Sequence, residues 1–369
     1  MTAASATRRQ LLRGVLGTAA ALLLEACSSV EGRRPSELDP RVPALLDRTI
    51  SVDMHTHAAG AGFMREPRYD LAGRMREGHM TAVCLCHSAD GPVIRRVPTT
   101  GVIKQYRDPR PGELDDFTER RLDFMDALLI PAKGLTRVLT PADLAAAKAA
   151  GRPALIGTIE GCHFMEGKLE RVEEVYRRGI RQLQIVHYMP SELGDQQTEP
   201  ARWNGLSPLG GQVIRECNRL GIVVDAAHGT YELVEQAAQI TSVPFILSHT
   251  SLARGPLRPY TRLISIEHAR LMVQVGGVIG VWPNGYQFVD AKAWIADIAR
   301  LVDVVGVDHV GIGTDMEGGV NEVWSNYADL PSVADLFLKQ GFSPEEASKL
   351  MGGNYVRVFT KVFESRKAS

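Results

Sequence analysis

The amino-acid stretch that decides the fold lies near residue 50 and reads TISVDMHTH, residues 49–57. A short run of β-branched and apolar residues that ends in polar ones is typical of a buried β-strand. Seven more runs of this kind follow it, each bounded by glycine, proline or a helix-capping residue. The eight predicted strands are 49–55, 81–86, 154–159, 182–187, 222–227, 244–248, 277–282 and 310–314. Several of them lack polar alternation, which indicates strands that are covered on both faces.

Helical patterns separate these runs. Amphipathic stretches at 169–178 and 207–220 each end at a glycine. Residues 343–346, SPEE, combine an N-cap, a proline at the first helical position and a capping-box glutamate, and residues 140–143, TPAD, are similar. Successive strand–helix units predict an α/β fold, a TIM-type (β/α)8 barrel. A doubly wound open sheet is the alternative, although we find no GxGxxG or P-loop motif to support a nucleotide-binding version.

The connection after the second predicted strand is long. It holds a polar, proline-rich loop at 90–112 and then a helix-like run at 113–129. Active sites of such barrels are built from the loops at the C-terminal ends of the strands. We therefore expect this loop insertion to shape a substrate pocket.

Composition excludes several classes of protein. The chain has 369 residues, and its 42 Lys and Arg against 43 Asp and Glu leave no basic field for non-specific nucleic-acid binding. A hydrophobic content of 44% excludes wholesale disorder, and five cysteines do not make a disulfide scaffold. Cys84, Cys86, Cys162 and Cys217 are predicted to be core residues. The first two would share one face of a strand, which disfavours a bond between them.

The N-terminus has the pattern of an export signal. Arg8 and Arg9 precede an apolar run at 15–24, which is too short for a membrane-spanning helix of about 20 residues. The arginine pair resembles a bacterial twin-arginine signal. The run ends at Ala26-Cys27, which resembles a lipoprotein processing site, although Glu25 departs from that pattern.

These features predict three parts. Residues 1–27 are a signal peptide with a lipidated Cys27, residues 28–46 are a polar tether, and residues 47–366 are the barrel. The protein is then exported, as a periplasmic protein or a membrane-anchored lipoprotein. A signal that is cleaved without lipidation is the alternative.

Ionisable side chains lie at the ends of six of the predicted strands. They are His55, His57, Glu160, His187, His228, His249 and Asp315. The C-terminal ends of barrel strands converge on one face, so these groups are expected at one place. A single histidine at a strand end is more often structural, and only the combination favours a site.

The residue types favour a metal centre. His55 and His57 lie two apart and share a strand face, which lets both bind one ion. Neutral imidazoles with a carboxylate suit Zn²⁺ or a neighbouring divalent metal. The two oxygens of Glu160 suit a bridge between two ions about 3.5–4 Å apart.

At these positions the chain resembles the membrane dipeptidase (renal dipeptidase) family of zinc metallopeptidases, which are amidohydrolase-type barrels. The resemblance covers most of residues 50–360. The matching stretches include VDMHTH at 52–57, IEG at 159–161, QIVHY at 184–188, SHTSLAR at 248–254 and DHVGIGTD at 308–315.

The resemblance implies a dipeptidase with two zinc ions bridged by Glu160. One ion would be held by His55, His57 and Glu160, and the other by Glu160, His228 and His249.

It also implies roles for residues around the metals. His187 would bind and polarise the substrate carbonyl oxygen, and Asp315 would handle the proton of the attacking water. Arg254 would pair with the terminal carboxylate, because its planar fork fits a carboxylate and it closely follows His249.

Three departures from the family pattern bear on the choice of substrate. His57 stands where well-known members carry aspartate, Ser191 where they carry asparagine, and Met316-Glu317 where Phe and Asp are common. A different amidohydrolase-type hydrolase, acting on an amide, a lactone or a secreted small molecule, is therefore the second hypothesis. A non-catalytic binding lipoprotein is the third. The expected binding partner is a small peptide substrate, and no nucleic acid is expected. Contact with a membrane is expected only through the lipid anchor. A homodimer is possible from the sequence.

Overall fold

The eight predicted strands form a parallel barrel. The computed structural model describes residues 38–60, 70–98, 101–318 and 321–366. The barrel strands are β1 (Val52–Thr56), β2 (Ala82–Ser88), β6 (Ala154–Glu160), β7 (Ile180–Gln184), β8 (Val223–Asp225), β9 (Ile246–Thr250), β10 (Val278–Val281) and β11 (Val310–Ile312). They are hydrogen-bonded in that order, all in parallel.

The ends of this sheet meet just beyond β11. The backbone N–H of Asp315 donates to the His55 carbonyl oxygen at 2.9 Å, and the N–H of His57 donates to the Met316 carbonyl oxygen at 2.9 Å. The (β/α)8 barrel is therefore confirmed, and the doubly wound alternative is wrong.

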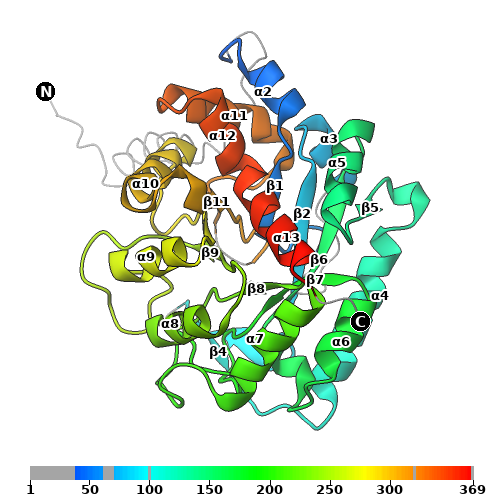
Figure 1. Ribbon diagram of the computed structural model, residues 1–369, viewed down its shortest axis with the longest axis vertical. Coiled ribbons are helices and arrows are strands. Elements are labelled where there is room, and N and C mark those ends of the chain that lie inside the picture. The colour runs from blue at the N-terminus through cyan, green and yellow to red at the C-terminus, as the bar shows by residue number, and fades with distance from the viewer. Residues whose placement is uncertain (1–37, 61–69, 99–100, 319–320, 367–369) are drawn as a thin grey trace, which may run out of the picture.

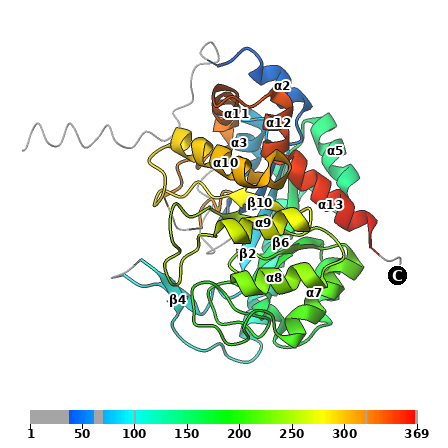
Figure 2. The same cartoon turned by 60° about the vertical axis from the view of Figure 1, so that its left-hand side comes forward.

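Helices surround the strands (Figures 1 and 2). They are α3 (Leu71–Glu77), α4 (Glu113–Leu128), α5 (Pro141–Ala150), α6 (Arg171–Arg177), α7 (Pro208–Leu220), α8 (Tyr231–Ile240), α9 (Ile266–Gln274), α10 (Ala291–Val305), α11 (Leu330–Lys339), α12 (Pro344–Ser348) and α13 (Asn354–Glu364). Local sequence fixes their starts: the side chains of Ser207, Thr230 and Ser265 each accept a backbone N–H of the first helical turn. The predicted capping box joins Ser343 and Glu346.

Helix α13 covers the N-terminal end of the barrel and crosses the strands in Figure 1. Its Tyr355, Val358, Phe359 and Val362 belong to an apolar cluster with the first residues of six barrel strands. Those first residues are Val52, Ala82, Ala154, Val223, Ile246 and Val278. This end of the barrel is therefore part of the apolar core.

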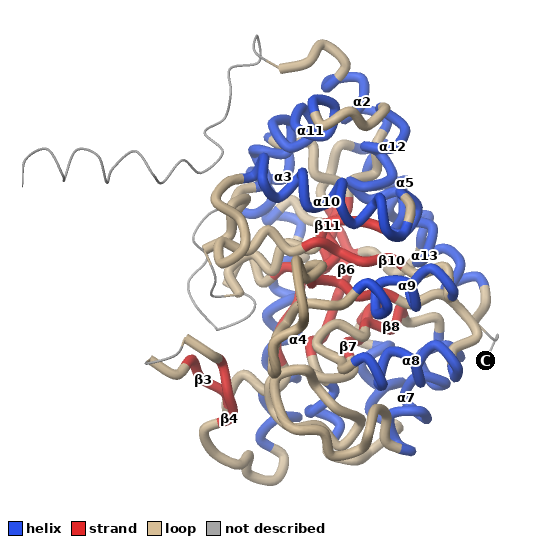
Figure 3. Tube along the Cα trace, turned by 90° about the vertical axis from the view of Figure 1, so that its left-hand side faces the viewer, coloured by secondary structure: helices blue, strands red, loops and turns tan. Residues whose placement is uncertain are grey.

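The insertion after β2 contains more structure than a polar loop. Strands β3 (Ile94–Arg96) and β4 (Ile103–Gln105) pair as an antiparallel hairpin, which stands apart from the barrel strands in Figure 3. The helix expected at 113–129 is α4. A short strand, β5 (Thr136–Arg137), then joins the sheet beside β6.

The folded part begins earlier than predicted. Helix α2 (Val42–Arg48) lies inside the stretch expected to be tether, and it buries Val42, Leu45 and Leu46. A tether that reaches residue 46 is therefore wrong, because these three apolar residues have helical spacing and pack into the core. The predicted signal peptide with Cys27 lies outside the described residues, so export and lipidation stay predictions. Within the described part of the chain, no helix is long and apolar enough to cross a membrane.

Candidate metal centre

The ionisable side chains at the strand ends meet in the C-terminal mouth of the barrel. His55 lies in β1 and His249 in β9, Glu160 ends β6, and His228 and Asp315 lie three residues beyond β8 and β11. All are buried except Asp315, which is partly exposed.

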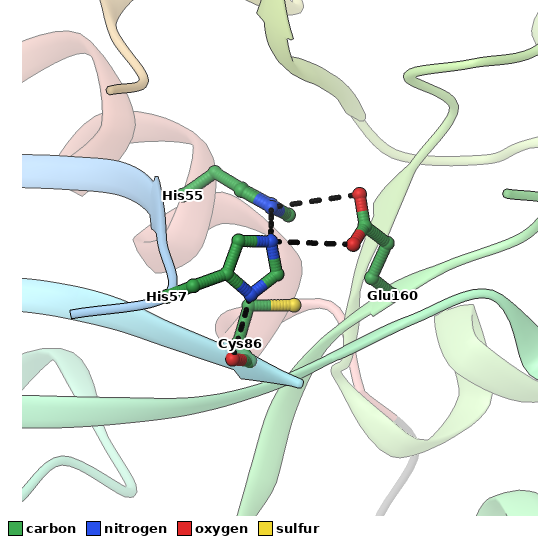
Figure 4. Close-up of side chains that lie close together, drawn as sticks. All are labelled: His55, His57, Cys86 and Glu160. Carbon is green, nitrogen blue, oxygen red and sulfur yellow. Dashed lines mark hydrogen bonds and ion pairs between the residues drawn. The ribbon is translucent and has the colours of Figure 1, made fainter. Parts of the chain in front are cut away.

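Glu160 lies between two pairs of histidines. Its Oε1 lies 3.3 Å from His228 Nε2 and 3.5 Å from His249 Nε2. On the other side, Oε2 lies 3.4 Å from His57 Nε2, and Oε1 lies 3.6 Å from His55 Nε2 (Figure 4). The structure thus brings together both ligand sets implied by the family resemblance.

The spacing of the nitrogens fits metal ions. His55 Nε2 and His57 Nε2 are 3.3 Å apart, and His228 Nε2 and His249 Nε2 are 3.0 Å apart. Two imidazole nitrogens on one tetrahedral zinc ion lie about 3.3 Å apart, given bonds of about 2.0–2.1 Å. A bound divalent ion would let both nitrogens of each pair face one point with their lone pairs.

The other ring nitrogens are oriented by neighbouring groups. His57 Nδ1 lies 3.1 Å from the Cys86 carbonyl oxygen, and His249 Nδ1 lies 2.9 Å from Ser248 Oγ. Ser88 Oγ donates to Glu160 Oε2 at 2.7 Å. Such contacts fix which nitrogen faces the centre and hold the carboxylate in place.

Electrostatics also favours a cation here. Burial lowers the pKa of His55 to about 4 and holds the pKa values of His228 and His249 well below the ordinary value, so these rings stay in the neutral form that binds metals. Burial also acts on His57, but hydrogen bonds to Asp315 and Glu160 outweigh it and raise the pKa of His57 to about 10. The surrounding histidines hold the pKa of Glu160 well below its usual range despite burial. The centre therefore attracts positive charge.

His187 is held by a residue that the sequence did not single out. Asp90 Oδ1 lies 2.6 Å from His187 Nδ1, and Asp90 Oδ2 accepts the backbone N–H of Met189 at 2.8 Å. Asp90 is fully buried, and the opposite nitrogen of His187, Nε2, lies 3.2 Å from Glu160 Oε2. Burial lowers the pKa of His187, but the charges of Asp90 and Glu160 outweigh it and raise that pKa. The position of Asp90, two residues after β2, was the available signal.

Asp315 is partly exposed and lies beside the cluster of histidines around Glu160. Its Oδ1 is 3.3 Å from His57 Nε2 and 3.8 Å from His55 Nε2. Its backbone φ of 51° turns the chain at this point, directly after the barrel closes.

A cavity of about 380 Å³ opens above the cluster. Its floor contains His57, Glu160, His187, His228 and Asp315. Its walls come from the β3–β4 hairpin and from the loops after β9 and β10. They include Arg96, Val102, Ile103, Arg262, Trp282, Asn284 and Tyr286. Arg96 Nη1 donates to Tyr286 Oη at 3.2 Å, which joins the hairpin to the opposite wall.

The structure does not bring Arg254 to this cavity. Its side chain is 60% exposed and lies 3.3 Å from Asp297. Arg254 is not among the residues that line the cavity, and its guanidinium lies 6.0 Å from the centroid of the Phe288 ring. The prediction that Arg254 lies beside the site is therefore wrong.

Arg262 occupies the place expected of Arg254. It lines the cavity and lies later in the same loop after β9. Its guanidinium donates to Gln197 Oε1 at 3.0 Å and to the His249 carbonyl oxygen at 3.2 Å. In the sequence, Arg262 is a basic residue beyond the SHTSLAR block. The path of the loop, which distinguishes Arg262 from Arg254, cannot be read from the sequence.

Comparisons with known proteins agree with this geometry. The model of the membrane dipeptidase family (peptidase family M19) matches residues 41–369. Dipeptidase aclJ of Aspergillus oryzae is 29% identical over 226 residues, which are 58% of this chain and 52% of that protein. Dipeptidase tcpJ of Claviceps purpurea is 28% identical over 223 residues, with the same shares. The chain spans about half the length of the curated relatives it matches.

Solved structures share the fold. The probable dipeptidase PvdM of Pseudomonas aeruginosa has a TM-score of 0.76 at 18% identity, over 90% of this chain and 100% of that one. A metallopeptidase of Rhodobacter sphaeroides, liganded with a phosphinate mimic of the dipeptide L-Ala-D-Ala, has a TM-score of 0.71 at 18% identity, over 85% of this chain and 99% of that one.

Proposed function

Because the chain belongs to the membrane dipeptidase family, we propose that it hydrolyses dipeptides at a divalent metal centre in the mouth of its barrel. The observation that carries this proposal is the convergence of four histidine nitrogens on the two oxygens of one buried carboxylate, Glu160. Simple ligand binding does not require such a constellation, whereas activation of a water molecule does.

Two zinc ions are the metals that best suit the donors. His55, His57 and Glu160 would hold one ion, and Glu160, His228 and His249 the other. Bound divalent ions supply Lewis acidity and a water whose pKa is lowered toward about 7.

The residues on the cavity floor divide the remaining work. Asp315 Oδ1 accepts the proton of the attacking water and returns it to the departing amine. His187 directs Nε2 at the substrate oxygen that gains negative charge, while Asp90 fixes the proton on Nδ1. Hydrogen-bond donors that are already oriented in this way stabilise the transition state, because they need no reorientation during the reaction.

Arg262 is the side chain that suits the free carboxylate of a dipeptide. Its fork is anchored by Gln197 and by a backbone carbonyl, so it is presented to the cavity in one orientation. The volume of the cavity suits a small molecule and excludes a folded polypeptide.

A substrate panel tests the proposal. The purified chain is assayed with dipeptides whose C-terminal residue is L or D, and with the same dipeptides carrying a C-terminal amide. We expect turnover of free dipeptides that a chelator abolishes and Zn²⁺ restores, with much weaker turnover of the amides. Bound metal without turnover of any dipeptide would point to another amide or lactone substrate, and turnover that resists complete metal removal would contradict the proposal.

A further inference from the structure

Two cysteines on β2 share a strand face but have different surroundings. In the pairing of β2 with β6, Cys84 lies opposite Ile156, Cys86 opposite Thr158 and Ser88 opposite Glu160. Ser88 reaches Glu160 by its hydroxyl, so this face of β2 points into the barrel. Cys86 is therefore one step below the metal centre, and Cys84 is two steps below.

Cys84 belongs to the apolar end of the barrel. It is fully buried in the cluster that contains Tyr355 and Phe359 of α13. It serves as a small apolar side chain there, as buried free cysteines generally do.

Cys86 belongs to the donor cluster. Its Sγ, a nitrogen of His55, a nitrogen of His57 and an oxygen of Glu160 all lie within 4.8 Å of one another. Figure 4 shows the sulfur beside the His57 ring, on the side toward Glu160. The thiol contacts the His87 carbonyl oxygen at 3.7 Å, which is a weak hydrogen bond.

We propose that Cys86 binds, as a thiolate, the metal ion held by His55, His57 and Glu160. This inference rests on the metal centre of the proposed function. Donor atoms that share one zinc ion lie about 3.3–3.8 Å apart. The four donor atoms lie within 4.8 Å of one another, so metal binding requires the sulfur to move closer by at most about 1 Å.

Charge supports the assignment. Two divalent ions bring four positive charges into a buried site, and Glu160 and Asp315 supply two negative ones. The ligand histidines are neutral when they bind. A thiolate adds a third negative charge next to the ion whose other histidine ligands are His55 and His57, and so reduces the cost of the buried charge.

A thiolate also sets metal preference. Sulfur ligands favour Zn²⁺ and Cd²⁺ over Mn²⁺ and Mg²⁺. We therefore expect loss of the sulfur to weaken Cd²⁺ binding by ~10–100-fold or more. Removal of groups that only support metal ligands already has an effect of this size. The effect on Mn²⁺ binding should be smaller.

Cobalt spectroscopy on the full chain tests the proposal. The metal is replaced by Co²⁺ in the wild type, in Cys86→Ser and in the matched control Cys84→Ser. Visible d–d bands report bound cobalt in each protein, and a near-ultraviolet thiolate-to-Co²⁺ charge-transfer band reports sulfur ligation. We expect that band in the wild type and in Cys84→Ser, and its loss in Cys86→Ser.

The outcomes separate this inference from the proposed function. Bound cobalt and dipeptide turnover without the charge-transfer band in the wild type would overturn Cys86 ligation alone, as would a band that persists in Cys86→Ser. A wild type that binds no cobalt would overturn the metal centre and this inference together. If Cys86→Ser fails to fold, ¹¹³Cd NMR of the wild type decides, because a thiolate ligand moves the cadmium resonance strongly downfield.

Discussion

The two ends of the barrel are built by the same strands but contain opposite kinds of side chain. At the N-terminal end, Val52 and Ala154 pack beneath Tyr355 and Phe359 of α13. At the other end, His57 lies five residues after Val52, just beyond β1, and Glu160 lies six residues after Ala154, at the end of β6. Burial of apolar side chains at the N-terminal end stabilises the fold. The polar side chains at the C-terminal end form the candidate site. Substitutions should affect stability at the first end and metal binding or catalysis at the second.

Two buried carboxylates, those of Asp53 and Asp225, lie between the two ends of the barrel. Asp53 is fully buried and accepts hydrogen bonds from the Thr314 hydroxyl and the Tyr327 hydroxyl, both at 2.6 Å. Asp225 accepts the backbone N–H groups of Ala227 and Ser248, each at 3.0 Å. These carboxylates hold the strand ends in place, and their oxygens are directed at protein donors rather than toward the centre of the cluster.

The largest effect is expected from removing a histidine of the mouth. His228→Ala should lower kcat/KM by more than about 10³-fold, because it removes a ligand rather than a supporting contact. Elemental analysis should show loss of bound metal. The matched control is His309→Ala, whose ring lies near the start of β11 against the Gly277 carbonyl oxygen and should leave metal content unchanged. A full metal complement in His228→Ala would contradict its assignment as a ligand.

The next effect is expected at the opposite end. Phe359→Ala leaves a cavity in the apolar cluster under α13 and should lower the free energy of unfolding by about 3–5 kcal/mol. Urea denaturation measures this change. At temperatures where the variant is folded, metal content should match that of the wild type. Loss of metal from the folded variant would show that the two ends are not separable.

A pair of arginine variants tests the walls of the mouth. Arg262→Ala should raise KM for dipeptides by about 10–150-fold, since a hydrogen-bonded charged partner contributes about 1.5–3 kcal/mol. Arg254→Ala should change KM little, because that side chain is mostly exposed and faces Asp297. Steady-state kinetics with both variants decides between the two residues, and the reverse result would restore Arg254 as the carboxylate partner.

A smaller effect is expected from the support of His187. Asp90→Asn should lower kcat by about 10–100-fold while KM and metal content change little, because the ligands stay and only the orientation of the ring is lost. Asp90→Ala should be at least as impaired. An unchanged kcat with a raised KM would mean that Asp90 shapes substrate binding instead.

The sequence predicted the barrel and the cluster for one physical reason. Runs such as 49–55 are apolar because the strands are covered on both faces, and a histidine just after such a run can only lie at a strand end. Topology then places His55, Glu160 and His249 together without any knowledge of distances. The apolar end was visible only in part, since nothing in the sequence shows that α13 packs across it.

The sequence could not reveal features that depend on loop paths or side-chain environment. Arg254 and Arg262 lie in the same loop, and only the path of that loop brings Arg262 to the cavity and leaves Arg254 outside it. The turn after β2 places Asp90 in contact with His187, and the sequence does not show that contact. Cys86 has the sequence context of a core residue, as Cys84 does, and only its position beside Glu160 distinguishes it.

Metal content of the wild type and of Glu160→Gln tests most directly the claim that the mouth is a metal centre organised by one carboxylate. We predict about two divalent ions per wild-type chain and fewer than one in the variant, with both proteins folded. A wild type that binds no divalent metal, or a Glu160→Gln variant with the full complement, would contradict the claim.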